Sequence, residues 1–178
     1  MAPRSFSGTD LQTLVEALDV AEDRIDSFYK LSLRQWRRCR FDVKTLRGLT
    51  RKEIARHAFA LLNKHAAAQN NLGWGASTRD TYVICVQDHQ ILRALDRDEN
   101  LSLLAILVYV LTHELVHVVR FSTFDQRFEV SGPVRHKEEQ FVHAKTFEML
   151  RDVAIPNLGY VLAAYQNHRV FELGNYTS

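Results

Sequence analysis

One stretch of the sequence constrains the fold more than any other. Residues 101–119 form a long apolar run made mostly of Leu, Ile and Val. This length approaches what is needed to cross a membrane, but His113, Glu114 and His117 interrupt the run near its end. Because ionisable side chains are costly inside a bilayer, we expect no membrane span. The run instead predicts a buried helix over about residues 101–120, apolar and therefore packed on nearly every face.

The rest of the composition is typical of a soluble globular protein. The chain has 178 residues, of which 46% are hydrophobic and 25% charged, and this length predicts a single domain over residues 1–178. Its 23 Lys and Arg residues nearly balance its 21 Asp and Glu residues, so net charge gives no reason to expect nucleic-acid binding. The first residues lack the apolar core of a secretory signal, and we expect a cytoplasmic protein.

The two cysteines predict neither a disulfide framework nor a cysteine zinc site. Cys39 and Cys85 are far apart in the sequence and form no C-x-x-C pair. We expect both to be thiols in the core.

Hydrophobic periodicity predicts a mainly helical α+β chain with a small sheet. The expected helices cover about residues 10–20, 50–68, 101–120, 134–152 and 157–170. The second of these is predicted from a capping box, Thr50-Arg51-Lys52-Glu53, that precedes apolar residues at helical spacing. Residues 81–86 are β-branched and aromatic, which predicts a strand buried on both faces. Residues 26–46 show a mixed pattern that permits a helix first and a strand near Phe41 and Val43.

The most informative motif is His113-Glu114-Leu115-Val116-His117, which lies in the most clearly helical segment. Residues four apart share one face of a helix, so both imidazoles can bind one metal ion. Glu114 lies about 100° around the helix, within reach of a water molecule on that metal. The alternative is a metal-free core in which two buried histidines bond to carboxylates. Burying three ionisable groups without a function is costly, which favours the metal site.

These five residues resemble the active-site motif of the zincin metallopeptidases, in which two histidines bind zinc and a glutamate acts as general base. The resemblance implies that His113 and His117 are zinc ligands and that Glu114 is the catalytic base. It also implies Zn²⁺ as the cofactor.

The resemblance further implies a zincin-like fold. In that fold a small sheet precedes the central active-site helix, and a following helix carries the third metal ligand; the segments predicted near 81–87, 101–120 and 134–152 fit this order. The longer metzincin motif is absent, because Arg120 and Thr123 stand where it requires Gly and His.

A catalytic zinc site needs three protein ligands and one open position, so the helix after the motif is expected to supply one ligand. Its helical wheel places His136, Glu139 and His143 on the more apolar half and Glu138 among the solvated charges. Glu139 follows His117 by 22 positions, a gap similar to that in the gluzincins, whose third ligand is Glu. We therefore expect Glu139 as the ligand and His143 behind it. The reverse assignment stays open, since gluzincins often carry Asp at the position of His143.

The resemblance implies a peptidase that acts on a peptide or protein substrate. Zinc would activate a water molecule, Glu114 would take its proton, and the water oxygen would attack the peptide carbonyl. Such a reaction also needs a donor for the developing oxyanion. The candidates in the late segment are Tyr160, Tyr165 and His168.

The rival interpretation is a metal-binding or regulatory protein that has the motif but does not cleave peptides. Such a protein would bind a partner or nucleic acid through the strongest basic cluster of the chain, which consists of Arg34, Arg37, Arg38 and Arg40 around Trp36. No nucleic-acid-binding motif accompanies this cluster. We therefore expect the arginines to form a solvated face and do not expect nucleic-acid binding.

Overall fold

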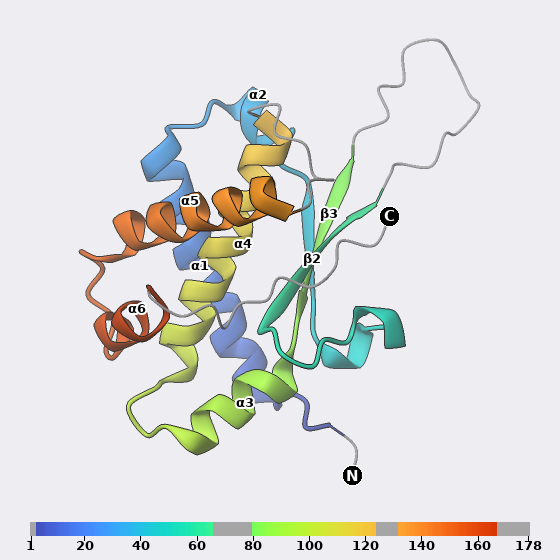
Figure 1. Cartoon of the computed structure of the whole chain (residues 1–178), viewed down its shortest axis with the longest axis vertical. Helices are drawn as coiled ribbons and strands as arrows, with labels where there is room; N and C mark the ends of the chain where they lie inside the picture. Colours follow the sequence, from blue (N-terminus) through green and yellow to red (C-terminus); the bar gives the residue numbers. More distant parts are fainter. Residues whose placement is uncertain (1–2, 66–79, 124–131, 167–178) are drawn as a thin grey trace.

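The computed structural model describes residues 3–65, 80–123 and 132–166. Within these ranges the chain forms six α-helices and a three-stranded mixed sheet (Figure 1), which confirms a mainly helical protein whose small sheet precedes the central helix. The elements are α1 Gly8–Tyr29, α2 Leu33–Trp36, β1 Phe41–Lys44, the 3-10 turns η1 Leu46–Gly48 and η2 Arg51–Glu53, β2 Ala60–His65, β3 Thr81–Val86, α3 Asp88–Arg97, α4 Leu103–Thr123, α5 Gly132–Leu150 and α6 Leu158–Gln166.

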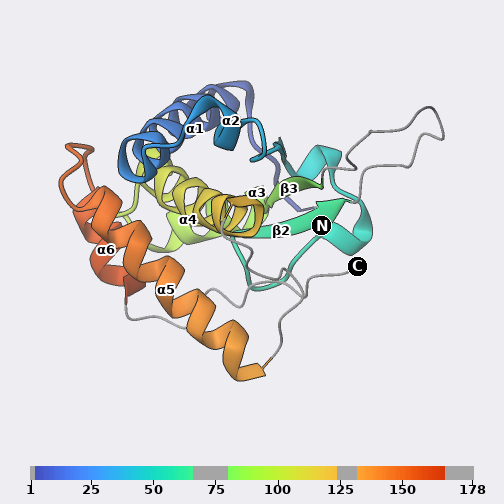
Figure 2. The same ribbon diagram turned by 90° about the horizontal axis from the view of Figure 1, so that it is seen from above.

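Helix α4 is the core of the molecule. Every residue from 105 to 119 is buried. In Figure 2 α4 is seen obliquely, with α1 on one side, α5 and α6 on another, and the sheet beside them. Its length and mean hydropathy of 1.7 would suit a membrane span, but 83% of that apolar window is buried inside the protein. The expectation of a helix packed on nearly every face is confirmed.

Helix α1 packs along α4 through small side chains. Ala17 and Ala21 are fully buried, and they let the two helices approach closely. The helix begins two residues earlier than expected, because Ser7 and Asp10 form its capping box. It also runs to Tyr29 rather than stopping near residue 20, since Ile25 continues the buried stripe.

The sheet has the order β1-β3-β2, with β1 parallel and β2 antiparallel to the central strand. β3 is buried from Tyr82 to Val86, which confirms the strand predicted over residues 81–86 and its burial on both faces. β1 confirms the strand expected near Phe41 and Val43.

The helix expected over residues 50–68 is wrong. The capping box is present, with the Thr50 backbone N–H donating to Glu53 at 2.7 Å, but it closes only the single turn η2. The chain then extends into β2, which pairs with β3 along its whole length. Pairing with a buried strand satisfies the backbone groups of this segment, and this tertiary interaction outweighs local helix propensity.

Helix α3 was not expected. Its first residue, Asp88, is 1% exposed and accepts hydrogen bonds from the backbone of Phe6 at 2.8 Å and of Leu46 at 2.9 Å. A single carboxylate therefore joins the N-terminal segment, η1 and the beginning of α3.

The last two helices lie close to where the sequence places them. α5 begins at Gly132, whose φ of 60° suits glycine, and Pro133 occupies its first turn. It ends at Leu150, two residues before the expected boundary. α6 begins at Leu158 as expected, while residues 167–170 lie outside the described ranges.

The cysteines are both buried, as expected. Burial raises the pKa of the Cys85 thiol to about 12. Cys85 is therefore a protonated core side chain at neutral pH.

Candidate metal centre

Helix α4 places both motif histidines on one face, at the middle of the molecule. His113 is 2% exposed and His117 is fully buried. The spacing of four residues extends in both directions along this face, to Tyr109 before the motif and Phe121 after it, and successive ring centroids are 6.4, 5.0 and 5.5 Å apart. The motif therefore sits within an aromatic stripe that shields it from water.

Helix α5 brings Glu139 against these two imidazoles. One carboxylate oxygen, Glu139 Oε2, lies 3.3 Å from His117 Nε2 and 3.5 Å from His113 Nε2. Zinc–nitrogen distances of about 2.0–2.1 Å and zinc–oxygen distances of about 2.0–2.2 Å put two ligands of a tetrahedral site about 3.3–3.5 Å apart. Both measured separations therefore have the length of an edge of a zinc tetrahedron.

The charged groups around Glu139 favour a bound cation. Burial alone would raise the pKa of Glu139, but hydrogen bonds to His113 and His117 hold that pKa well below its ordinary range. Burial alone would lower the pKa of His117, but the bond to Glu139 raises it instead. Glu139 is therefore ionised. Because a buried carboxylate is stable only beside a positive charge, either a proton on an imidazole or a metal ion between the imidazoles has to balance it.

Three buried polar atoms at the centre lack hydrogen-bond partners among the residues that the structure describes. They are Glu114 Oε2, Glu139 Oε1 and His117 Nδ1. The two carboxylate oxygens fit a site that takes further ligands, such as a metal ion and water. His117 Nδ1 departs from the usual zinc site, in which the second ring nitrogen donates to a carboxylate or carbonyl.

His143 follows Glu139 by four residues, on the same side of α5, and also reaches the centre. Its ring centroid is 4.5 Å from that of His113, and one ligand atom from each of His113, Glu139 and His143 lies within 4.8 Å of the others. The Nδ1 atom of His143 is hydrogen-bonded to the Tyr109 hydroxyl at 2.8 Å. Burial and the neighbouring His113 lower the pKa of His143 to about 4, so its ring is neutral, the form that binds metals.

Glu114 is 1% exposed beside the two histidines. Burial raises its pKa, and the nearby His113 and His117 offset this rise only in part. A carboxyl group with a raised pKa accepts a proton more readily near neutral pH, which is what a general base requires.

The expectation that Glu138 is a solvated charge is wrong. Its carboxylate forms two hydrogen bonds with Arg120 of α4, at 2.5 and 2.7 Å, and both side chains are almost covered. The Arg120 guanidinium also lies 3.9 Å from the ring centroid of Phe141. This ion pair joins α4 and α5 one residue from Glu139 and so helps set the position of the carboxylate.

Only some of the other sequence candidates lie near the centre. Tyr160 is directed elsewhere, because its hydroxyl donates to Asp98, which precedes α4, at 2.8 Å. Tyr165 is closer, with its ring 6.0 Å from that of Tyr109. His136 is exposed on α5, and His168 lies outside the described residues.

The basic cluster is solvated, as expected. Its four arginines are exposed around the short helix α2, and they are Arg34, Arg37, Arg38 and Arg40. Trp36 does not stack openly on the surface but donates from Nε1 to Asp26 at 2.6 Å.

No family model, curated protein or solved structure matches this chain. The functional argument therefore rests on the residues and their geometry.

The sharpest structural prediction concerns the third ligand. Alanine at Glu139 is expected to weaken zinc binding about as severely as loss of a histidine, because Oε2 is the atom both imidazoles face. Alanine at His143 is expected to cost only about 10–100-fold in zinc affinity, the usual effect of losing a supporting residue. Titration of the metal-free variants with zinc against a competing chelator measures both effects.

Glu148 provides a matched control on the same helix, since it is an exposed glutamate that pairs with Lys145. Alanine at Glu148 should leave zinc affinity unchanged. Stronger loss at His143 than at Glu139 would show that the two roles are reversed.

Proposed function

We propose that the protein is a zinc-dependent hydrolase, and more specifically a peptidase of the gluzincin type. The observation that carries this proposal is the approach of both motif histidines to one oxygen of Glu139, at 3.5 Å for His113 and 3.3 Å for His117. Glu114 stands next to them with a raised pKa. Three ligands and one base are the complete residue set that this chemistry needs.

Zinc, when bound, would acidify a coordinated water molecule and polarise the substrate carbonyl. Glu114 would take the proton of that water and pass it to the leaving amine, a transfer favoured by a pKa near the working pH. Tyr109 would hold the His143 ring in place beside His113, because the Tyr109 hydroxyl is hydrogen-bonded to His143 Nδ1. The aromatic stripe on α4 would exclude bulk water from the reacting groups.

An edge strand supports peptides as the substrate class. β2 lies at one edge of the sheet, and no strand within the described ranges pairs with its outer side. β2 also packs against α4, the helix that carries the motif. Extended peptides bind such edges through main-chain hydrogen bonds, which would hold a substrate alongside the metal centre.

The test is a metal analysis followed by a cleavage assay. Protein purified with zinc should retain one ion per chain and cleave members of a mixed peptide library, as read by mass spectrometry. A zinc chelator should stop cleavage, and added zinc should restore it. Zinc binding without cleavage of any peptide would favour the metal-binding or regulatory interpretation. Absence of zinc binding would contradict both.

A further inference from the structure

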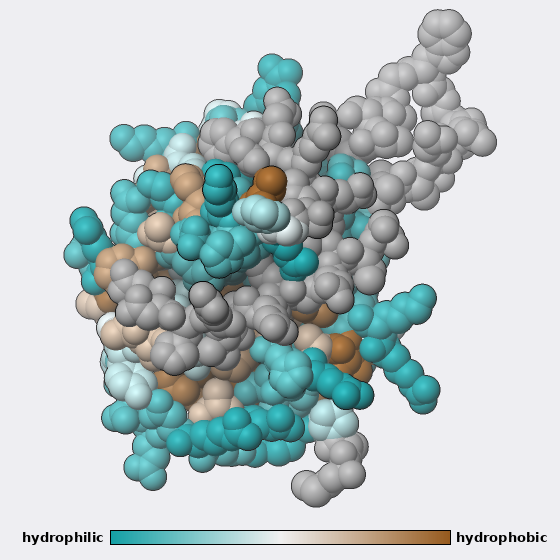
Figure 3. All heavy atoms as spheres, in the orientation of Figure 1, coloured by the Kyte–Doolittle hydropathy of each residue, from teal (hydrophilic) through white to brown (hydrophobic). Residues whose placement is uncertain are grey.

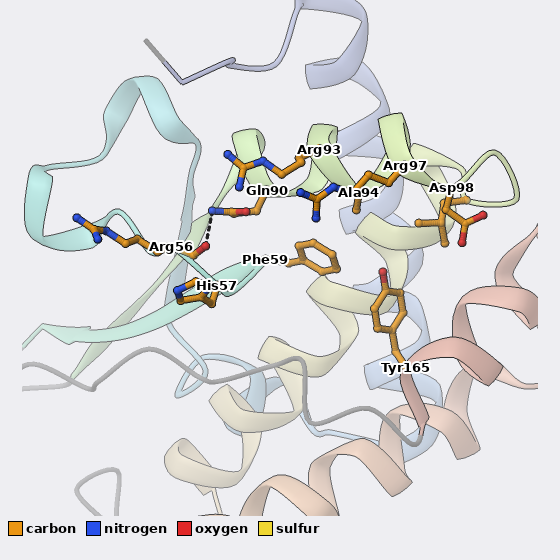
Figure 4. Close-up of a pocket in the computed structure, with 10 residues that line it drawn as sticks. Arg56, His57, Phe59, Gln90, Arg93, Ala94, Arg97, Asp98 and Tyr165 are labelled. Atoms are coloured by element: carbon orange, nitrogen blue, oxygen red, sulfur yellow. Dashed lines mark hydrogen bonds between the residues drawn. The ribbon is translucent and has the colours of Figure 1, made fainter. Parts of the chain in front are cut away.

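A cavity of about 710 Å³ lies between α3 and the segment that leads into β2 (Figure 4). This volume is in the range of sites that bind small ligands. We call it the arginine cavity, because Arg56, Arg93 and Arg97 contribute to its lining, with Phe59 and Tyr165 forming an aromatic wall. Hydrophilic side chains also gather over α3 on the outer surface (Figure 3).

The lining of the arginine cavity carries a net positive charge. In the part of the chain that the structure describes, Arg56, Arg93 and Arg97 form no ion pair. The lining also contains Asp98. Its carboxylate, however, accepts hydrogen bonds from the Tyr160 hydroxyl at 2.8 Å and the Asn100 backbone at 3.0 Å.

Two of the arginines are exposed side chains on the same wall of the cavity. Arg93 and Arg97 are four residues apart and share one face of α3, a spacing at which like charges destabilise a helix. Arg56 belongs to the segment on the other side of the cavity, and its side chain points away from the other two (Figure 4). Its backbone oxygen accepts a hydrogen bond from Gln90 Nε2 of α3 at 2.6 Å, which ties the two walls together. An anion between the walls would offset the repulsion.

The cavity lies one aromatic layer from the metal centre. The Tyr165 ring in its wall is 6.0 Å from the Tyr109 ring, which is 6.4 Å from the His113 ring. The ring centroids of Tyr165 and His113 are therefore at most about 12 Å apart. An extended peptide advances about 3.3 Å per residue, so a substrate held at the metal reaches the Tyr165 wall of the cavity within about four residues.

We propose that the arginine cavity binds a carboxylate of the peptide substrate and so selects peptides with a negative charge a few residues from the cleaved bond. Arginine is suited to this because its planar guanidinium forms paired hydrogen bonds with a carboxylate. The carboxylate comes from a Glu or Asp side chain or from the peptide's C-terminus. This inference rests on the proposed peptidase function.

Binding is measured with the Glu114→Gln variant, in which peptides are turned over about 10²–10⁴-fold more slowly. The probes are peptides of about eight residues, long enough to reach both sites. Glu replaces Gln at each position in turn, and each peptide is made with a free and an amidated C-terminus. At one position, or at the free C-terminus, the charged peptide should bind about 10-fold more tightly than its neutral partner. The double variant Arg93→Gln/Arg97→Gln should abolish that difference.

The matched control is Arg37→Gln/Arg38→Gln, which removes the same charge from exposed arginines near α2. It should keep the preference. Any of three results would overturn the proposal. Charged and neutral peptides could bind equally well, the preference could survive the loss of Arg93 and Arg97, or no peptide could bind at concentrations up to about 1 mM. Selective binding by a wild-type zinc protein that cleaves none of the peptides would refute the peptidase function while leaving the anion site standing.

Discussion

Alanine at His117 is expected to remove zinc from the protein and to abolish hydrolysis with it. His117 Nε2 lies 3.3 Å from Glu139 Oε2, at the point where the proposed ligands meet. Losing one of three protein ligands should weaken zinc binding by more than the about 10–100-fold that loss of a supporting residue costs. Alanine at His113 should have the same effect. Metal content after gel filtration and zinc titration against a chelator measure the loss.

Two controls separate ligand loss from misfolding. His136 is an exposed histidine of α5, and His136→Ala should retain one zinc per chain. Circular dichroism should show that His113→Ala and His117→Ala keep the helical content of the parent, since α4 is held by apolar packing on nearly every face. A full equivalent of zinc in either folded variant would contradict the site assignment.

The central helix and its motif could be predicted because they depend on local sequence. The run around residues 101–119 is so apolar that it has to lie in the core. Helical periodicity then determines which face carries His113 and His117. The region before it could not be predicted in the same way. Residues 60–65 become a strand only because β3 pairs with them, and nothing in a capping box shows what a segment will meet across space.

The candidate site was likewise predictable only where it depends on a single helix. The wheel of α5 correctly places Glu139 on the side that faces α4, because that depends on one helix alone. It fails for Glu138, whose partner Arg120 belongs to α4. Tyr109 had a usable signal, since it precedes His113 by four residues and must share its face, whereas its bond to His143 depends on how the two helices cross.

Glutamine at Glu114 is expected to leave zinc bound and to lower the rate of hydrolysis by about 10²–10⁴-fold, the usual contribution of a general base. The amide has the shape of the carboxylate but cannot take a proton from water. The matched control is Glu148→Gln on the exposed face of α5, which should leave the rate unchanged. Loss of zinc in Glu114→Gln would make Glu114 a ligand, and the peptidase mechanism would then be wrong.

The same substitution has a stability effect whose sign follows from the Glu114 pKa. Burial raises that pKa above its unfolded value of about 4.3. The folded metal-free protein therefore binds more protons at Glu114 than the unfolded chain does, so this group's contribution to stability falls as the pH rises above the unfolded pKa. Glu114→Gln removes the cost of ionising a buried group. Without metal, the variant should unfold at a higher temperature than the parent at pH 7, with the gap narrowing toward pH 4. An equal gap at both pH values would show that Glu114 ionises in the folded protein as easily as in the unfolded chain.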